Sequence, residues 1–509
     1  MNSTTILIII ASYFGILLLV SYFTGKEDNN ETFFKAKKQS PWYVVAFGMI
    51  GATLSGVTFI SVPGLIKGQQ FAYMQGVFGF FVGTFFIILV LLPLYYRLNV
   101  TSIYQYLDQR FGSKSYKTGA FFFLISRITG ASFRLFLVAL AMQYIVFASL
   151  GVPFWLTVVL SILLIWVYTF RGGIKTIVWT DTLQTLAMLV AVGVAIYLLL
   201  DKLDITYFEF LKSDAFASKS KIFHFEDAKS FKYFWKYFIG GVFIAIAMTG
   251  LDQDMMQKNL TCKNQKDAQK NMATMITLLL VVNFVFLSLG ALLFIYAEKF
   301  GVAIPIVDGK PRTDLLFPEI AMNQGLGSAL AIVFIIGLIA AAYSSADSAL
   351  TSLTTSVSVD FLDIENKPKE EQKPLRKKVH VIISLVLIVV VIVFNNLKGN
   401  VVGNLFKFAT FTYGPLLGLF AFGLFTNKML KEKYVWIVAI FSILITYLIT
   451  ISPTLFAYYN ELSLDDCKET AWVCAGKFAS KNYYQFHWEI LPINGLMTFI
   501  GLWLISKKK

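Results

Sequence analysis

The chain has 509 residues, of which 57% are hydrophobic and 15% are charged, and its net charge is +14. A soluble chain carries about 25% charged residues, and runs of about 18 apolar residues are long enough to span a bilayer. The composition therefore excludes a soluble protein and predicts an all-α membrane protein that crosses the bilayer many times. The excess of basic residues is typical of cytoplasmic loops in such a protein, so we expect no nucleic-acid partner.

We expect about thirteen membrane-spanning helices within a single transmembrane domain, residues 1–509. No basic residue precedes the first apolar run, so we interpret it as a retained helix and not as a signal peptide. The expected spans are residues 4–24, 42–66, 75–96, 117–149, 153–170, 177–200, 232–250, 272–298, 327–359, 379–396, 401–425, 434–452 and 489–506.

The basic residues predict the orientation of these spans. With the N-terminus outside, the cytoplasmic loops carry 26 of the 44 Lys and Arg residues, and the shortest outer loops carry at most one Lys. The positive-inside rule therefore favours a cell-membrane protein with an outer N-terminus and a cytoplasmic C-terminus. Cys262 then lies in a cytoplasmic loop and should be reduced. The sequence leaves undecided whether Cys467 and Cys474, in an outer loop, form a disulfide.

The second expected span is a poor candidate for a straight helix. Three glycines and three hydroxyl residues lie within residues 48–58, and Pro63 follows. Membrane transporters tolerate an unwound segment where it lines a cavity, and its freed carbonyl groups can bind a cation. The alternative is close helix packing through small residues.

Two arginines, Arg127 and Arg134, lie inside the fourth expected span. Because they are seven residues apart, they lie on nearly the same face of a helix. A buried guanidinium group pairs with a carboxylate, which can belong to the protein or to a bound solute. The sequence leaves open which arginine has which partner.

Two acidic residues lie inside apolar spans. Asp181 stands at the start of residues 177–200, and Asp347 lies in a hydroxyl-rich stretch with Ser344 and Ser348 on the same helix face. A carboxylate within the membrane is costly, so it usually faces a cavity and binds an ion, a proton or a partner charge. Carboxylate, hydroxyl and carbonyl oxygens suit hard cations such as Na⁺. These residues therefore predict a cation-coupled transporter.

Residues 172–181, Gly-Gly-Ile-Lys-Thr-Ile-Val-Trp-Thr-Asp, and residues 341–348, Ala-Ala-Tyr-Ser-Ser-Ala-Asp-Ser, together resemble the sodium:solute symporter family. Residues 249–257 and 413–418 resemble further segments of that family. The resemblance covers about residues 40–425. It implies a LeuT-type fold with two inverted five-helix repeats, and Na⁺-coupled symport of a small organic solute by alternating access. The implied parts are a first repeat at 42–200, a second at 232–425, and peripheral segments at 1–41 and 426–509.

The resemblance also implies a main Na⁺ site and a candidate second site. The main site would use the carbonyls of Gly51, Leu54 and Ala341 and the hydroxyls of Ser344 and Ser345, although Gly51 departs from an alanine often found there. The second site would use Asp181, Ser344, Asp347 and Ser348. Asp347 stands where some two-sodium carriers have a hydroxyl. Whether this second site binds Na⁺, binds H⁺ or is a structural hydrogen bond therefore stays open.

The same resemblance implies a substrate site. The implied contacts are Thr53, Ser55, Thr58 and Arg127, and Gln75, at the start of the third expected span, is a further candidate contact. The hydroxyl spacing resembles that of sialic-acid carriers, and Thr58 occupies a place where sugar carriers have a glutamine. We therefore favour a carboxylate or sialic-acid-like organic anion, with a Na⁺/sugar symporter as the alternative. Gln75 can instead be a helix-end residue.

Other classes of protein fit less well. An enzyme would need a convergent set of acid, base or nucleophile residues, and we find none beyond the ion-site residues. A channel would show a filter-like repeat, and a sensor would ordinarily append an output domain. The expected partners are the solute, Na⁺ and the lipid bilayer, without an obligatory protein partner. The solute, the number of coupled Na⁺ ions and the oligomeric state stay open.

Overall fold

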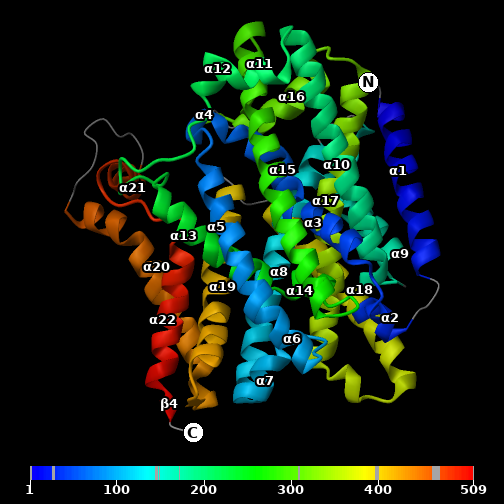
Figure 1. Ribbon diagram of the computed structural model, residues 1–509, viewed down its shortest axis with the longest axis vertical. Coiled ribbons are helices and arrows are strands. Elements are labelled where there is room, and N and C mark those ends of the chain that lie inside the picture. Colours follow the sequence, from blue (N-terminus) through cyan, green and yellow to red (C-terminus); the bar gives the residue numbers. More distant parts are fainter. Residues whose placement is uncertain are drawn as a thin grey trace.

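Long helices run along the long axis of the molecule and form an all-α bundle, as Figure 1 shows. The computed structural model describes residues 3–25, 29–143, 147, 150–170, 172–307, 310–395, 401–460 and 470–507. The long helices are α1 (Ser3–Thr24), α3 (Trp42–Gly64), α5 (Tyr73–Phe86) with its continuation α6 (Leu92–Leu98), α8 (Ser113–Met142), α9 (Phe154–Thr169), α10 (Ile174–Leu203), α13 (Phe234–Ala245), α15 (Gln265–Phe300), α17 (Ser328–Ser356), α18 (Lys369–Phe394), α19 (Val401–Phe425), α20 (Val435–Tyr459) and α22 (Ile490–Leu504).

Short elements connect and cover these helices. The short helices are α2 (Asn30–Lys35), α4 (Ile66–Gln69), α7 (Gln105–Phe111), α11 (Tyr207–Lys212), α12 (Asp214–Ala217), α14 (Gln253–Asn259), α16 (Leu316–Asn323) and α21 (Ala471–Asn482). Two antiparallel strand pairs are β1 (Ile306–Val307) with β2 (Lys310–Pro311), and β3 (Met429–Leu430) with β4 (Ser506–Lys507). The second pair ties the end of α22 to the segment that follows α19.

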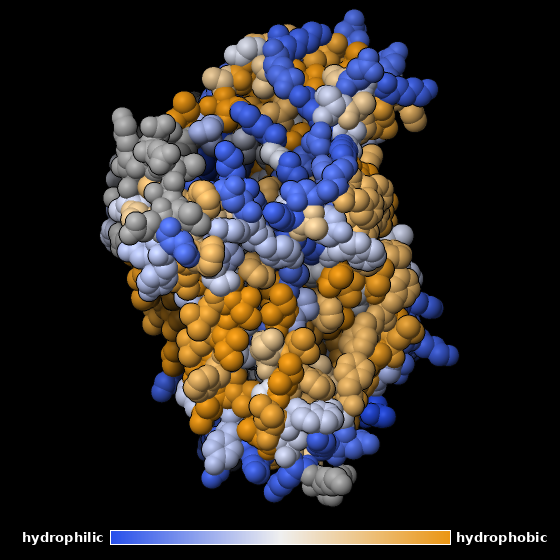
Figure 2. Space-filling model, turned by 90° about the vertical axis from the view of Figure 1, so that its left-hand side faces the viewer, coloured by the Kyte–Doolittle hydropathy of each residue, from blue (hydrophilic) through white to orange (hydrophobic). Residues whose placement is uncertain are grey.

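The expected all-α membrane architecture is confirmed. Among the described residues, nine helices are long and apolar enough to cross a membrane, and two bent pairs raise this number to eleven. Two further apolar helices, α9 with 16 residues and α22 with 15, are shorter. The expected number of thirteen spans is therefore not established by length and composition. Figure 2 shows an apolar band between two hydrophilic ends, as expected for a surface that contacts lipid.

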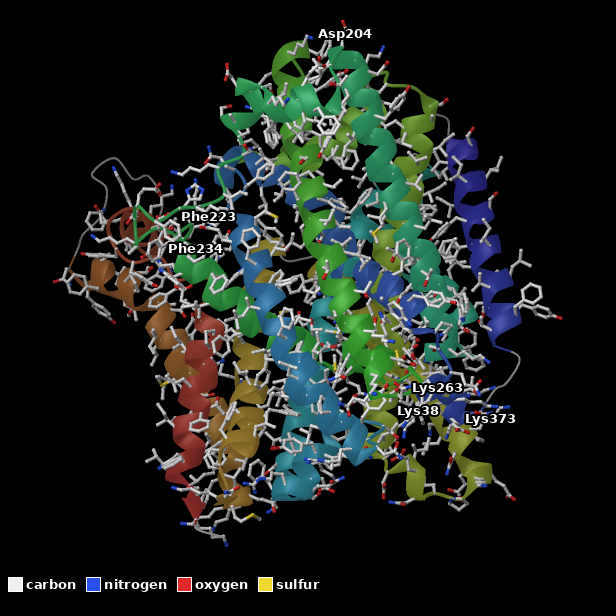
Figure 3. The ribbon with its side chains drawn as sticks, in the orientation of Figure 1. Lys38, Asp204, Phe223, Phe234, Lys263 and Lys373 are labelled. Carbon is white, nitrogen blue, oxygen red and sulfur yellow. The ribbon has the colours of Figure 1, made fainter. Side chains whose placement is uncertain are left out.

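Lysines from three expected cytoplasmic loops lie toward the same end of the molecule. The labelled lysines Lys38, Lys263 and Lys373 come from three expected cytoplasmic loops and lie near the lower end of Figure 3, whereas Asp204 lies at the upper end. The marked N and C ends lie at opposite ends in Figure 1. Of the cysteines, Cys262 is a buried free thiol. Cys467 lies outside the described residues, whereas Cys474 is disulfide-bonded.

Two spans are broken inside the bundle. Helix α3 bends by 60° between Trp42–Gly56 and Thr58–Gly64, and Ser55 there has φ 50° and ψ 166°. The pair formed by Phe234–Gly250 and Gln253–Asn259, which is α14, bends by 68°. The Asp252 side chain caps the second part by accepting hydrogen bonds from the N–H groups of Asp254 and Met255. The glycine-rich, hydroxyl-rich second span is thus interrupted where the sequence predicted.

The helices of the first half of the chain pack in pairs against helices of the second half. Helix α3 packs against α15 while α5 packs against α13, and α8 packs against α19 while α10 packs against α17. Small residues permit the closest of these approaches. A Cβ atom added to Gly79 would stand 2.2 Å from the Phe238 carbonyl oxygen, and one added to Gly241 would stand 2.3 Å from that of Gly76. Helices α5 and α13 therefore touch backbone to backbone.

Substitution of Gly79 should destabilise this contact. Gly79→Ala places a methyl group against backbone that cannot move aside, so the fold should lose about 1–3 kcal/mol of stability. The measurement is the thermal unfolding midpoint of the purified protein in detergent. Gly193→Ala is the matched control, because this helical glycine has no atom within 4 Å of an added Cβ. Equal midpoints for both variants would contradict the close contact.

Candidate functional site

The break in α3 opens onto a cavity at the centre of the bundle. Its volume is about 120 Å³, and α3, α5, α8, α13 and α15 contribute its walls. Four of the expected substrate residues line it, namely Thr53, Ser55, Thr58 and Arg127. Tyr73 and Arg134 line it as well. The structure therefore brings the hydroxyl groups of the broken helix together with both arginines of α8.

Gln75 lies outside the lining of this cavity. Its side-chain amide donates to the carbonyl oxygens of Ala72, at 3.1 Å, and Lys232, at 3.0 Å, and its oxygen accepts from the His224 N–H at 3.1 Å. The amide therefore ties the start of α5 to the segment before α13. This geometry corresponds to the helix-end alternative that the sequence left open.

A second, larger cavity adjoins the first. It has a volume of about 460 Å³ and lies between the end of α3, Tyr237 of α13 and the α20–α22 region. Polar groups of Gln69 and His487 contribute to its lining. Thr58 and Tyr73 line both cavities, so these two side chains stand between them.

The two arginines of α8 have different partners. The Arg127 guanidinium forms an ion pair with the Asp254 carboxylate, and its Nη1 lies 3.8 Å from Oδ2 of Asp252. Arg134 has neither an ion pair nor a hydrogen bond to any part of the chain that the structure describes, and its Nε is buried. The Arg127 guanidinium is therefore paired within the protein, whereas Arg134 lines the cavity without an ion-pair or hydrogen-bond partner among the described residues.

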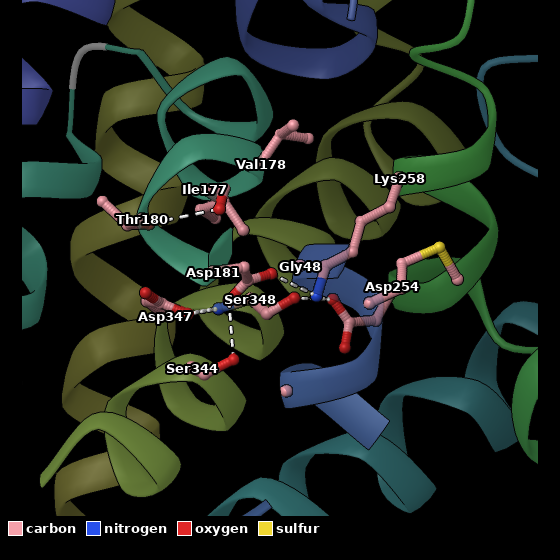
Figure 4. A network of polar contacts seen from close by, with 12 residues as sticks. Gly48, Ile177, Val178, Thr180, Asp181, Asp254, Lys258, Ser344, Asp347 and Ser348 are labelled. Carbon is pink, nitrogen blue, oxygen red and sulfur yellow. Dashed lines mark hydrogen bonds and ion pairs between the residues drawn. The ribbon is translucent and has the colours of Figure 1, made fainter. Parts of the chain in front are cut away.

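Asp181 joins three helices near the break of the second bent pair. Its carboxylate accepts a hydrogen bond from the Ser344 hydroxyl at 2.6 Å and lies 2.7 Å from the Lys258 ammonium group (Figure 4). The side chains of Asp181 and Lys258 are each 1% exposed. These contacts connect α10, α14 and α17. From the sequence, Lys258 counts among the basic residues of an expected cytoplasmic loop, and its pairing with Asp181 was not predicted.

The other expected residues of the second Na⁺ site are also engaged. The Asp347 carboxylate accepts a hydrogen bond from the Tyr168 hydroxyl at 2.7 Å. The Ser348 hydroxyl donates to the Asp254 carboxylate, which is the partner of Arg127. Asp181, Asp347 and Ser348 thus lie in one buried polar cluster, as expected, but each already has a partner within the protein.

The expected main Na⁺ site lies where α3 packs against α17. Leu54, Ala341, Ser344 and Ser345 are all buried there. The Ser345 hydroxyl is buried and finds no hydrogen-bond partner among the described residues. Since a buried hydroxyl without a partner is costly, this atom fits a ligand position that an ion would complete.

The neighbours of Gly51 explain why a glycine stands at this position. Its N–H donates to the Thr185 hydroxyl oxygen at 3.1 Å, and that hydroxyl donates to the Asp181 carbonyl at 2.7 Å. A Cβ atom at Gly51 would stand 2.2 Å from the Thr185 oxygen. The glycine in place of an alanine therefore allows α3 to pack closely on α10 beside the threonine.

Known proteins share this sequence pattern and fold. A model of the sodium:solute symporter family matches residues 33–441. The sodium/sialic acid symporter NanT of Aliivibrio fischeri is 24% identical over 428 residues, which cover 82% of each chain. The sodium/sialic acid symporter SiaT of Proteus mirabilis is 25% identical over 503 residues, which cover 90% of this chain and 96% of that protein.

A solved structure extends the likeness to three dimensions. A Na⁺-coupled sialic acid symporter in a substrate-bound, outward-open state matches with a TM-score of 0.80 at 20% identity, over 99% of both chains. This likeness confirms the expected LeuT-type fold, and the family match confirms a transporter and not an enzyme. The chain therefore belongs to the sodium:solute symporter family, whose members couple solute movement to Na⁺ across a membrane.

Proposed function

We propose that this symporter carries a small organic anion with a carboxylate group, and that a sialic-acid-like sugar acid is the favoured solute. The observation that carries the proposal is the unpaired Arg134 guanidinium in the wall of the central cavity. A guanidinium fork matches a carboxylate in geometry and charge. The two sialic acid symporters among the relatives support the same class of solute.

The broken helix adds to this preference. Ser55 and Thr58 line the cavity at the break, where freed amide groups and the positive end of a half-helix favour negative charge. Thr53 and Arg127 complete the polar wall, and we propose that Arg127 contributes while it remains paired with Asp254. A neutral sugar is the alternative solute, but it would leave the Arg134 charge without a partner.

We further propose that Na⁺ binds between α3 and α17. The ligands are the carbonyls of Gly51, Leu54 and Ala341 and the hydroxyl oxygens of Ser344 and Ser345. The unpartnered Ser345 hydroxyl supports this assignment. The Ser344 hydroxyl donates its hydrogen to Asp181, so its oxygen lone pairs remain available to a cation.

The reciprocal packing supports two inverted repeats, residues 42–200 and 232–425. The first helix of each proposed repeat is broken, and each packs against the second helix of the other repeat. Such an arrangement permits alternating access by movement of one set of helices around the fixed site. Residues 1–41 and 426–509 are the peripheral segments.

The distribution of lysines supports the proposed orientation in the cell membrane. The end that carries Lys38, Lys263 and Lys373 faces the cytoplasm together with the C-terminus, and the N-terminus faces outward. The apolar band then contacts lipid, and we propose no obligatory protein partner.

Loss of the Ser345 hydroxyl should weaken Na⁺ binding. Ser345→Ala removes one ligand oxygen from a dry site, which costs about 1–3 kcal/mol, or about 5- to 150-fold in the Na⁺ concentration for half-maximal uptake. Ser352→Ala is the matched control, since this buried hydroxyl donates to the Ala349 carbonyl of its own helix at 3.1 Å. Unchanged Na⁺ dependence in Ser345→Ala would refute the site.

The two arginines should respond differently to substitution. Arg134→Gln removes the unpaired charge, so the Michaelis constant for sialic acid should rise about 10- to 150-fold, as for loss of a charged hydrogen bond.

Arg127→Gln leaves Asp254 uncompensated and should cost about 3–5 kcal/mol of stability. Uptake of labelled sialic acid and thermal unfolding of the same preparations measure both effects.

The solute assignment has its own test. Uptake from a panel of labelled sugars and organic acids, with and without Na⁺, should show competition by sialic acid or monocarboxylates. Robust uptake of a neutral sugar that these acids do not inhibit, and that Arg134→Gln leaves unchanged, would show that the solute is not an anion.

A further inference from the structure

We propose that the ammonium group of Lys258 takes the place of a second Na⁺ beside Asp181, so that this protein binds a single Na⁺ per chain. Lys258 is then a specificity-determining residue for ion coupling. The inference rests on the main Na⁺ site proposed above and goes beyond it, because it concerns the neighbouring acidic cluster.

Each oxygen of the Asp181 carboxylate already has a partner within the protein. One oxygen, Oδ1, accepts the Ser344 hydroxyl at 2.6 Å, and the other, Oδ2, lies 2.7 Å from the Lys258 Nζ. Both side chains of the ion pair are 1% exposed (Figure 4). Lys258 thus supplies the positive charge that a buried carboxylate requires.

The neighbouring carboxylates of Asp347 and Asp254 also accept hydrogen bonds from hydroxyl groups. The Tyr168 hydroxyl donates to Asp347, and the Ser348 hydroxyl donates to Asp254. A hard cation needs several oxygen ligands at once, so at this site it would share the carboxylate oxygens with their present hydrogen-bond donors. A Na⁺ ion at Asp181 would also stand close to an ammonium group, and like charges repel strongly in a dry interior. Departure of Lys258 is therefore a condition for binding a second ion.

The helix segment that carries Lys258 is anchored to its neighbours. Lys258 lies on α14, the second part of a bent span, and the adjacent Gln257 donates to the Phe34 carbonyl and the Thr355 hydroxyl, each at 2.9 Å. A tethered ammonium group does not leave with the solute. It therefore stabilises Asp181 as a bound ion would, but it draws no driving force from the Na⁺ gradient.

The test is a count of bound Na⁺ on the purified full-length protein in detergent, by equilibrium binding of radioactive Na⁺ alone. Wild type should saturate at one Na⁺ per chain. Lys258→Met keeps the length of the side chain but frees Asp181, so it should saturate at two. Lys263→Met, which removes an exposed lysine five residues along the chain, should bind one ion as wild type does.

A double variant covers the case in which Lys258→Met does not fold. Lys258→Met with Asp181→Asn removes both charges together, so it should fold and bind one Na⁺. Two ions bound by wild type, one bound by folded Lys258→Met, or two bound by the double variant would each overturn the inference. If Ser345→Ala leaves the wild-type ion bound, the main-site assignment fails, whereas the comparison between wild type and Lys258→Met still decides the role of Lys258.

Discussion

A charge inside a membrane protein must find a partner, and the ion pairs around α14 show how this chain meets that constraint. Lys258 of α14 neutralises Asp181 of α10, and Asp254 of α14 neutralises Arg127 of α8. The short second part of a bent span is thereby fastened to two long helices at once. Since breaking one buried pair leaves an uncompensated charge, these contacts define where the bent span can rest.

Arg134 is the exception to this pairing, and we propose a functional reason for it. A buried arginine without a direct ion-pair partner is costly, which supports its proposed role in binding an anionic solute. The break in α3 is likewise a costly feature, here of the backbone, at the wall of the cavity. Ser55 adopts a positive φ, which costs about 1–3 kcal/mol, at the point where the helix turns its hydroxyl groups toward the cavity.

The sequence predicted the features that depend on local composition. The apolar runs predicted the helical bundle, the glycines and hydroxyl groups of residues 48–58 predicted the interruption of α3, and the Ser344–Ser348 stretch predicted a buried polar cluster. The partner of Asp181 could not be predicted, because Lys258 belongs to a basic loop region by sequence. In the structure Lys258 lies on α14, which follows a 68° bend, and its side chain is buried against Asp181.

The bend before α14 also decides which of the two arginines is paired within the protein. Arg127 and Arg134 share a helix face, so sequence spacing cannot separate them, and Arg127 was the favoured substrate contact. The fold places Asp254 against Arg127 and leaves Arg134 beside the cavity. Gln75 shows the same limit of prediction from sequence. Its side-chain amide hydrogen-bonds to backbone groups of a distant segment, for example to the His224 N–H, which is 149 residues away in sequence.

The most direct test of Na⁺-coupled anion transport is concentrative uptake by the purified protein in proteoliposomes. Labelled sialic acid is supplied at equal concentration inside and outside, and an inward Na⁺ gradient is then imposed. The account predicts that the solute accumulates inside above its outer concentration and returns to equality when an ionophore dissipates the Na⁺ gradient. Absence of accumulation for sialic acid and other small organic acids, or accumulation that persists without a Na⁺ gradient, would contradict it.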